Sequence, residues 1–340
     1  MDDLIRTVLA GQEAYVVGGA VRDRALGRPV VDIDVACRDP APAAAAYRHL
    51  AGGATFLLSE RHGAWRVARP DGRTVDFTLL RGTVEEDLAG RDFTINAIAV
   101  PIEERSSIDP FGGNADLEAR TIRVVSDRVF TDDPLRLLRA VRLEDELGFR
   151  LDEGAEQLVR RDAALVTSPA GERILSELER LSPAAYGRLD ELGLLEPLGG
   201  SAAGLVRAGR DPSPAVLLVA ALDRSVERLP ISNQTRRLAR ILLAAEAPPD
   251  PSPRAVHRFR RATEPWSLEA LTFVGRPELA QEVVAARAAE PGAPLVRGDE
   301  LGVPSGPEIG RLLARIAEER AAGTIRTRDE ALELARRERA

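Results

Sequence analysis

Residues 15–37, YVVGGAVRDRALGRPVVDIDVAC, constrain the fold more than any other stretch of the chain. A short apolar run ends at the pair Gly18-Gly19, and a second apolar run further on carries Asp32 and Asp34. The pattern predicts a strand, a glycine turn, a short helix and a second strand. Glycines permit positive φ and close backbone approach, and the first N–H groups of a helix attract anions. We therefore expect this turn to face phosphates.

The two aspartates are the only charged residues of the second apolar run. Because side chains alternate along a strand, both carboxylates lie on one face, opposite Val31, Ile33 and Val35. Two carboxylates on one face repel each other unless a cation joins them, and hard divalent cations bind through oxygen. Asp32 and Asp34 are therefore the predicted metal ligands. On the pattern alone, a pair of solvated strand aspartates remains the alternative.

A third carboxylate lies in the strand-like segment 74–80, which contains Asp76. Segments 54–58 and 63–68 are expected to form two further strands before it. If the Asp76 strand pairs beside the Asp32 strand, Asp76 becomes a third carboxylate on the metal face. The alternative is a solvated aspartate on an edge strand.

The composition of the chain indicates the cellular compartment in which such a site works. The chain has 340 residues, a net charge of −7 and a single cysteine, Cys37, so an internal disulfide is excluded. One free thiol fits a reducing compartment, the N-terminus lacks a secretory apolar region, and the longest apolar run, near 215–222, is too short for a bilayer. We expect a cytoplasmic protein without a membrane partner. All basic residues are arginine, and the negative net charge does not describe local patches.

The motif GGAVRD followed by DIDV resembles the signature of the DNA polymerase β-like nucleotidyltransferases. More specifically it resembles class II tRNA nucleotidyltransferases, the CCA-adding enzymes, and the related bacterial poly(A) polymerases. Residues 91–97, RDFTINA, resemble the second motif of that family. Family members usually carry two arginines there, whereas this chain has Gly90 before Arg91. The resemblance implies a nucleotide site that includes Gly18, Gly19, Arg22, Arg91, Asp92 and Asn96, with Arg91 on the triphosphate and Asp92 and Asn96 at the sugar end.

Residues 132–136, DDPLR, resemble the family's E-D-x-x-R nucleotide-reading motif, with Asp132 in place of glutamate. The resemblance implies that Asp133 and Arg136 read the base. Cytosine and adenine both present an amino donor beside a ring-nitrogen acceptor, which a carboxylate and a guanidinium match. Guanine and uracil mismatch both contacts, and unpaired buried polar groups cost about 1–3 kcal/mol each.

This motif also predicts the start of a helix, because N-cap acids are followed by Pro134, and the helix is expected to end at Gly148. Arg139 and Arg142 follow on it at a spacing of three. They are expected to support the helix or to contact phosphate, and both are counted among the nucleotide-binding candidates.

Three further segments resemble later family motifs. Residues 109–113, DPFGG, are interpreted as a hinge without direct chemistry. Residues 170–181 are expected to form salt bridges that hold the neck rigid. Residues 296–336 resemble the tail segment, in which Gly306 and Pro307 open a helix and Gly323 closes it.

The fold that the resemblance implies is α+β. A polymerase β-like head with a mixed sheet and helices on one side spans residues 1–125. All-helical parts follow, namely a neck (126–198) with the nucleotide-reading motif, a body (199–265) and an RNA-binding tail (266–340).

The activity that the resemblance implies is attack of an RNA 3′-hydroxyl on the α-phosphate of CTP or ATP. Asp32, Asp34 and Asp76 are the catalytic candidates, Mg²⁺ is the expected cofactor, and the tRNA acceptor arm is the expected partner. A poly(A) polymerase would share these motifs, and a non-catalytic RNA-binding protein is the alternative from another class.

The segment between Leu80 and Glu85 is only a few residues long. CCA-adding members carry a flexible loop there that is thought to help the switch from CTP to ATP. A chain this short cannot reach across a nucleotide site, since each residue spans at most about 3.6 Å. The short segment resembles CC-adding members, which leave the final adenosine to a separate A-adding enzyme.

Overall fold

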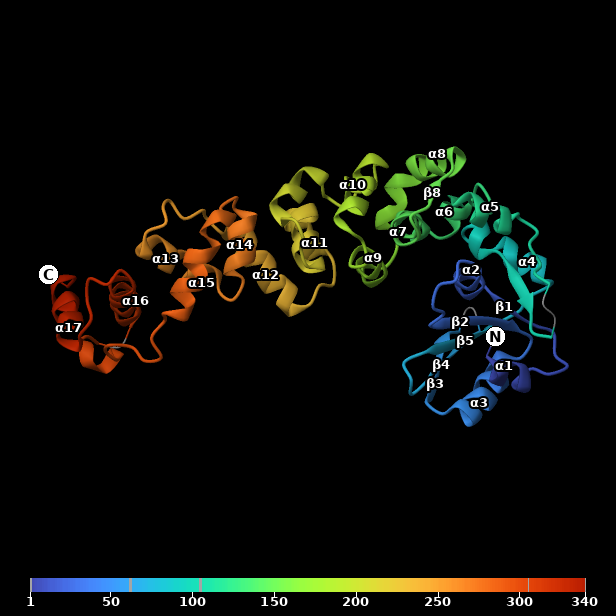
Figure 1. The fold of residues 1–340 in the computed structure, drawn as a ribbon, viewed down its shortest axis with the longest axis horizontal. Helices are drawn as coiled ribbons and strands as arrows, with labels where there is room; N and C mark the ends of the chain where they lie inside the picture. Colours follow the sequence, from blue (N-terminus) through green and yellow to red (C-terminus); the bar gives the residue numbers. More distant parts are fainter. Residues whose placement is uncertain (1, 61–62, 104–105, 305, 340) are drawn as a thin grey trace. The chain divides into compact units, whose positions relative to one another are not determined.

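The computed structural model describes residues 2–60, 63–103, 106–304 and 306–339 (Figure 1). The chain forms two compact units, Met1–Pro197 and Leu198–Ala340. The first unit contains the segments expected as head and neck, and the second those expected as body and tail. The finer division into four parts stays a prediction.

A six-stranded sheet organises the first unit, in the order β3-β4-β5-β2-β1-β6. β2 and β5 are parallel and every other neighbouring pair is antiparallel, which confirms the expected mixed sheet. The strands are β1 (Ala14–Val17), β2 (Asp32–Cys37), β3 (Ala54–Ser59), β4 (Ala64–Ala68), β5 (Thr74–Leu79) and β6 (Ala99–Pro101).

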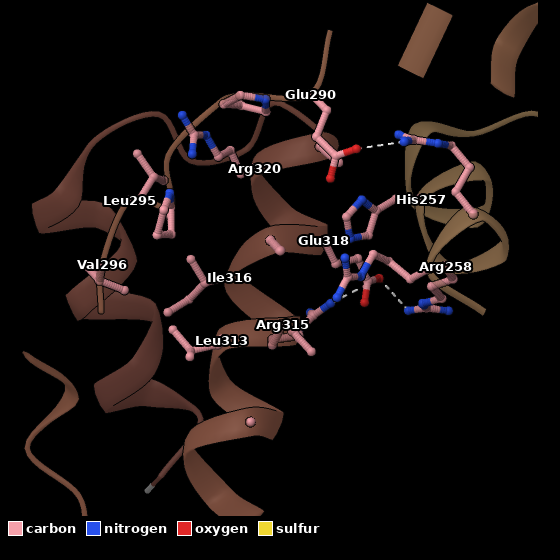
Figure 2. Close-up of a pocket in the computed structure, with 18 of the residues that line it drawn as sticks. His257, Arg258, Glu290, Leu295, Val296, Leu313, Arg315, Ile316, Glu318 and Arg320 are labelled. Carbon is pink, nitrogen blue, oxygen red and sulfur yellow. Dashed lines mark hydrogen bonds and ion pairs between the residues drawn. The ribbon is translucent and has the colours of Figure 1, made fainter. Parts of the chain in front are cut away.

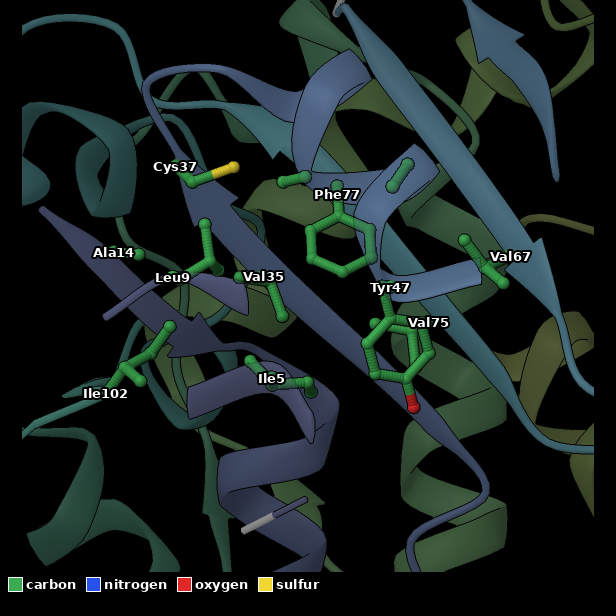
Figure 3. Packing of buried hydrophobic residues seen from close by; sticks show 12 residues of the cluster. Ile5, Leu9, Ala14, Val35, Cys37, Tyr47, Val67, Val75, Phe77 and Ile102 are labelled. Atoms are coloured by element: carbon green, nitrogen blue, oxygen red, sulfur yellow. The ribbon is translucent and has the colours of Figure 1, made fainter. Parts of the chain in front are cut away.

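One face of this sheet carries the main apolar core (Figure 3). Helices α1 (Asp3–Val8) and α3 (Pro40–Ala51) pack there. The fully buried rings of Tyr47 and Phe77 lie with centroids 5.6 Å apart. Ile33 and Val35 belong to this core, so the predicted alternation of β2 is confirmed.

The opposite face is partly covered as well. Buried residues Val17, Ala36 and Leu88 form a second cluster, and helix α4 (Val84–Ala89) contributes to it. The expectation of helices on one side only is therefore wrong. Asp32 on this face is exposed, whereas Ala36 further along β2 is buried in this cluster.

The neck helices follow the sheet: α5 (Gly113–Ala119), α6 (Val129–Asp132), α7 (Arg136–Leu147), α8 (Glu153–Asp162), α9 (Gly171–Leu178) and α10 (Pro183–Glu191). A short parallel pair, β7 (Thr121–Ile122) and β8 (Arg150–Leu151), adds two strands to them. As predicted, an acidic residue caps the helix just before Pro134: Asp133 is extended, its carboxylate accepts a hydrogen bond of 3.2 Å from the Leu135 amide, and its carbonyl accepts one of 3.0 Å from the Arg136 amide. Asp132 ends the preceding helix α6. The predicted end at Gly148 is confirmed by its left-handed conformation.

The described part of the second unit is helical, and it runs from yellow to red in Figure 1. Helix α16 (Pro307–Ala321) is capped by Gly306, and Gly323 adopts positive φ after it, as the tail motif predicts. None of the helices in the described residues combines the length and the apolar character needed to cross a membrane. The other helices are α11 (Pro214–Leu222), α12 (Asn233–Ala244), α13 (Pro253–Thr263), α14 (Ser267–Phe273), α15 (Ala280–Ala288) and α17 (Arg328–Arg337).

Candidate active site

The three predicted carboxylates lie on neighbouring parallel strands. Asp34 of β2 stands directly opposite Asp76 of β5, and Asp32 stands opposite Thr74. The Thr74 hydroxyl donates a hydrogen bond of 2.6 Å to Asp32 Oδ1. The predicted pairing of the Asp76 strand beside β2 is therefore confirmed. Asp32, Asp34 and Asp76 share one face of the sheet because cross-strand partners project to the same side.

Asp34 lacks enough positive charge around it. Burial raises the pKa of the Asp34 carboxyl, and the neighbouring carboxylates of Asp76 and Asp32 raise it further, whereas Arg91 and Arg139 act in the opposite sense. A carboxylate in such surroundings favours an added cation. The donor set on β2 is made of carboxylate oxygens, which fits a hard divalent ion such as Mg²⁺.

Gly18 brings this strand face to the RDFTINA segment. It has φ of 73°, and a Cβ there would lie 2.7 Å from Arg91 Nη1 and 3.4 Å from Asp34 Oδ2. Only glycine therefore fits between the guanidinium and the carboxylate. Gly18 is also the N-cap of α2 (Gly19–Ala25), whose first N–H groups follow it.

The RDFTINA segment forms a buried scaffold beside the turn. Asp92 Oδ1 accepts hydrogen bonds from the Phe93 amide (2.8 Å) and from Asn96 Nδ2 (3.0 Å). Asn96 Oδ1 in turn accepts one of 2.7 Å from Arg22 Nη1. Arg22 is buried and also contacts Asp23. Arg22, Asp92 and Asn96 are thus brought together as predicted, and in this structure Arg22 supports the scaffold.

The sequence pattern did not reveal that Arg139 of α7 reaches this scaffold. Its Nε lies 3.0 Å from Asp92 Oδ2. Burial opposes ionisation of Asp92, but Arg139, the Asn96 and Phe93 hydrogen bonds and Arg136 outweigh it and lower the pKa of the Asp92 carboxyl. Asp92 is therefore held as a carboxylate by groups that the chain itself supplies.

Arg91 Nε is buried and forms no hydrogen bond among the described residues. Buried polar groups are nearly always satisfied, so this donor beside a carboxylate site suits a ligand oxygen such as that of a phosphate. Asp92 Oδ2 also forms no hydrogen bond there, but Arg139 Nε lies 3.0 Å from it, so its charge is already paired.

The DPFGG segment packs against the scaffold, and its interpretation as a hinge stays a prediction. Asp109 accepts hydrogen bonds from the Gly113 and Asn114 amides, at 2.7 and 2.8 Å. A Cβ at Gly113 would lie 2.2 Å from the Thr94 carbonyl oxygen, so the two segments are in close contact. This close contact positions Thr94.

The base-reading candidates have different partners in the structure. Arg136 donates hydrogen bonds to the carbonyls of Gly90 (2.8 Å) and Arg91 (3.3 Å). Asp133 Oδ2 forms an ion pair of 3.0 Å with Arg173 of α9, a residue that the sequence analysis did not count in the site. Arg173 could have been found only from the packing of α9 beside Asp133.

Arg142 lies away from these groups. Its side chain is buried and pairs with Glu146 at 2.7 Å and with Glu177 of α9. Its contacts fit the expectation that it supports the helix, and they support the expected salt bridges of the neck. Its place among the nucleotide-binding candidates stays a prediction. Arg180 pairs with Glu146 in the same network.

Arg66 of β4 is a site residue that the sequence analysis missed. It forms two hydrogen bonds of 2.7 Å with the Asp76 carboxylate, Nε to Oδ1 and Nη2 to Oδ2. Among the described residues, no group of three or more acidic, histidine or cysteine side chains converges as a metal cluster. Asp76 is thus occupied by Arg66, and Asp32 and Asp34 remain as the carboxylates open to an ion.

A large cavity of about 1230 Å³ lies in the second unit, lined by residues of α13, α15 and α16 and of the chain between them (Figure 2). Its charges are largely paired, as Arg258 with Glu318 and Arg260 with Glu290 illustrate. It contains none of the motif residues of the first unit, so it is not the candidate active site.

The comparisons with known proteins agree with the motifs. Residues 14–82 and 60–123 match the poly A polymerase head domain family. An A-adding tRNA nucleotidyltransferase of Deinococcus radiodurans is 45% identical over 193 residues, covering 54% of this chain and 44% of that protein. A CC-adding tRNA nucleotidyltransferase of Geobacter sulfurreducens is 40% identical over 221 residues, covering 63% and 50%. The chain spans about half the length of these curated relatives.

One solved structure is similar to this chain over almost its whole length. The CCA-adding enzyme of Bacillus stearothermophilus in complex with CTP is 28% identical, has a TM-score of 0.73, and is matched over 99% of this chain and 97% of its own. These matches confirm the family resemblance that the motifs indicate, and they confirm the α+β fold with a nucleotidyltransferase head.

Proposed function

We propose that this chain is a tRNA nucleotidyltransferase that adds cytidine from CTP to the tRNA 3′ end. The observation that carries the proposal is the pair Asp32 and Asp34 on one strand face, with the Gly18 turn and Arg91 beside it. In that arrangement, two carboxylates that can bind a divalent cation lie beside a turn that can bind phosphate. The relatives act on tRNA by their names, and one similar structure is a complex with CTP.

The chain's own residues have distinct tasks in nucleotidyl transfer. Asp32 and Asp34 would hold Mg²⁺, which when bound stabilises charge on the triphosphate and assists the attacking hydroxyl. Gly18, the first amides of α2 and Arg91 bind the phosphates. Asp92, which pairs with Arg139 and accepts a hydrogen bond from Asn96, orders the sugar end of the site. The 3′-oxygen of the RNA bonds to the α-phosphorus as the bond to pyrophosphate breaks.

Base choice depends on Asp133 and Arg136. The carboxylate of Asp133 accepts from an amino group, and the guanidinium of Arg136 donates to a ring nitrogen. Arg173 holds Asp133, and the Gly90 and Arg91 carbonyls hold Arg136, so both groups are oriented before a nucleotide arrives. Pre-oriented groups lose less entropy on binding.

The connection after β5 favours CC addition over complete CCA addition. β5 ends at Leu79 and α4 begins at Val84. Thr83 caps α4 with a capping box to Glu86, which fixes the end of the connection. A segment this short and capped does not supply the mobile loop of CCA-adding members. A separate A-adding enzyme would then complete the tRNA.

The test uses a tRNA that ends at its discriminator base. The full-length chain is incubated with CTP alone, ATP alone, or both, with Mg²⁺, and the RNA 3′ ends are sequenced. We expect ends in CC with CTP alone and with both nucleotides. Ends in CCA would refute the CC-adding proposal, runs of adenosine would favour a poly(A) polymerase, and unextended RNA would refute cytidine addition to tRNA.

A further inference from the structure

One row of directly paired residues crosses the head sheet from the carboxylates to the edge strand. Asp34 pairs with Asp76, Asp76 with Arg66, and Arg66 with Phe56 of β3. Direct cross-strand partners project to the same face, so all four side chains lie on the carboxylate side. At about 4.8 Å between strands, the row places Phe56 about 14 Å from Asp34.

Asp76 and Arg66 form the middle of this row. Both carboxylate oxygens of Asp76 accept hydrogen bonds from Arg66, and Asp76 is the more buried partner, 12% exposed against 34%. Bidentate pairs of this kind fix a guanidinium in a defined plane. Among the described residues, Arg66 Nη1 has no hydrogen-bond partner. Arg66, which Asp76 holds in place, therefore keeps a free N–H donor on the carboxylate side of the sheet.

Phe56 ends the row with an exposed ring. It is 45% exposed, and its neighbour Leu57, which faces the other side of β3 opposite Trp65, is 41% exposed. An exposed aromatic residue on an edge strand is a candidate site for binding another molecule. Proteins commonly bind single-stranded nucleic acid through aromatic rings that stack on the bases and through cationic side chains that contact the phosphate backbone.

We propose that Phe56 and Arg66 form the subsite for the last nucleotides of the acceptor RNA strand. Phe56 stacks on a base, Arg66 binds a phosphate, and Asp76 is the positioning residue for Arg66 and not a metal ligand. The row is continuous with the face where the 3′-hydroxyl reacts, and about 14 Å corresponds to a few nucleotides at about 3.4 Å per stacked nucleotide. The inference rests on the proposed function.

The first test compares Phe56→Ala with Leu57→Ala, a matched loss of exposed apolar surface on the other face. Steady-state kinetics are measured with CTP and a tRNA that lacks its end and whose last acceptor base pairs are mismatched, so that its terminal nucleotides are single-stranded. For Phe56→Ala we expect the KM for tRNA to rise about tenfold, the loss of one stacked base, while the KM for CTP stays within about twofold. Leu57→Ala should match the wild type. Equal KM values for tRNA in the two variants would overturn the subsite.

The second test compares Arg66→Gln with Arg73→Gln, since Arg73 donates two hydrogen bonds to Oδ2 of Asp71 at an exposed position outside the row. Arg66→Gln should raise the KM for tRNA and lower the slope of its salt dependence by about 0.7, the value for one phosphate of a single strand. Arg73→Gln should change neither. An unchanged slope in Arg66→Gln would refute the phosphate contact.

The third test separates Asp76 from the metal ligands. Asp76→Asn should behave as Arg66→Gln does in the tRNA kinetics, and its Mn²⁺ affinity, measured by electron paramagnetic resonance of the free ion, should stay within about threefold of wild type. Loss of about tenfold or more, the scale on which metal-site changes act, would make Asp76 a ligand and overturn its positioning role. Urea unfolding of each variant checks that it is folded.

Failure of the proposed function gives a different result from failure of the subsite. If the wild type extends no RNA, the function is wrong, and the affinity of Phe56→Ala and Leu57→Ala for a fluorescent single-stranded RNA still tests the subsite. Analytical ultracentrifugation tests the alternative that a second copy of the chain covers Phe56. A wild-type dimer that Phe56→Ala dissociates would assign the exposed patch to a second copy of the chain and overturn the RNA assignment.

Discussion

Asp34 on β2 and Asp92 in the RDFTINA segment belong to the same site but are held in different ways. The pKa of Asp34 is raised by burial and by its acidic neighbours. The pKa of Asp92 is lowered despite burial, because Arg139 and the hydrogen bonds from Asn96 and Phe93 favour its charge. The strand face therefore needs a cation from outside, whereas the segment beside it is neutralised by the chain. This difference is the reason why we propose the first as the reaction site and the second as its scaffold.

The largest expected effect is on turnover. Asp34→Asn should lower the single-turnover rate of CMP incorporation by at least about 10³-fold, or about 4 kcal/mol of barrier, because a ligand for the cation is lost. Its free energy of unfolding in urea should be unchanged or higher, because a carboxylate with unfavourable surroundings is removed. Asp71→Asn, at an exposed turn, is the control. Activity of Asp34→Asn within about tenfold of wild type would refute the metal assignment.

Asp92 should show the opposite behaviour in stability. Asp92→Ala leaves Arg139, Asn96 and the Phe93 amide without their partner, so the free energy of unfolding should fall by about 3 kcal/mol. Asp132→Ala, in a neck pair with an exposed arginine, should change it by less than about 0.5 kcal/mol. Equal losses in the two variants, measured in urea, would contradict the scaffold role.

Base choice is the third effect in size. Asp133→Ala should lower the discrimination of CTP against UTP by about tenfold, because the variant lacks the carboxylate that mismatches the uracil carbonyl. Arg173→Gln should lower it less, by about threefold, since its pair with Asp133 is exposed. Values of kcat/KM for all four nucleotides check this, and unchanged ratios in Asp133→Ala would show that Asp133 does not read the base.

The smallest effect is on pH dependence. A carboxyl whose pKa is lower in the folded state stabilises the fold above its unfolded value of about 3.9, and this contribution is lost as pH falls through the folded value. In Asp92→Asn the free energy of unfolding should therefore decline less steeply below about pH 4 than in the wild type. Urea unfolding between neutral and acid pH measures the slopes, and parallel curves would contradict the lowered pKa of Asp92.

What the sequence predicted was mostly local. Alternation along β2 placed Asp32 and Asp34 on one face, and turn chemistry located the Gly18 turn and the end of α7 at Gly148. The fold class followed from the family motifs. Each of these features depends on residues a few positions apart, or on strings that resemble known motifs.

The rest depends on contacts that no local pattern encodes. Arg66 meets Asp76 only through the register of β4 and β5, and Arg139 meets Asp92 only because α7 packs against the RDFTINA segment. The turn chemistry of DPFGG did not reveal that Gly113 packs closely against the Thr94 carbonyl. Arginine carries all the basic charge of the chain, so its type alone could not separate site arginines from those of the neck.

The most direct test of the contrast between Asp34 and Asp92 is the affinity for Mn²⁺. It is measured by electron paramagnetic resonance of the free ion on the full-length wild type, Asp34→Asn and Asp92→Asn, each first shown to be folded. We predict that Asp34→Asn weakens binding by at least about tenfold, whereas Asp92→Asn stays within about threefold of wild type. Equal affinity of wild type and Asp34→Asn would contradict the account.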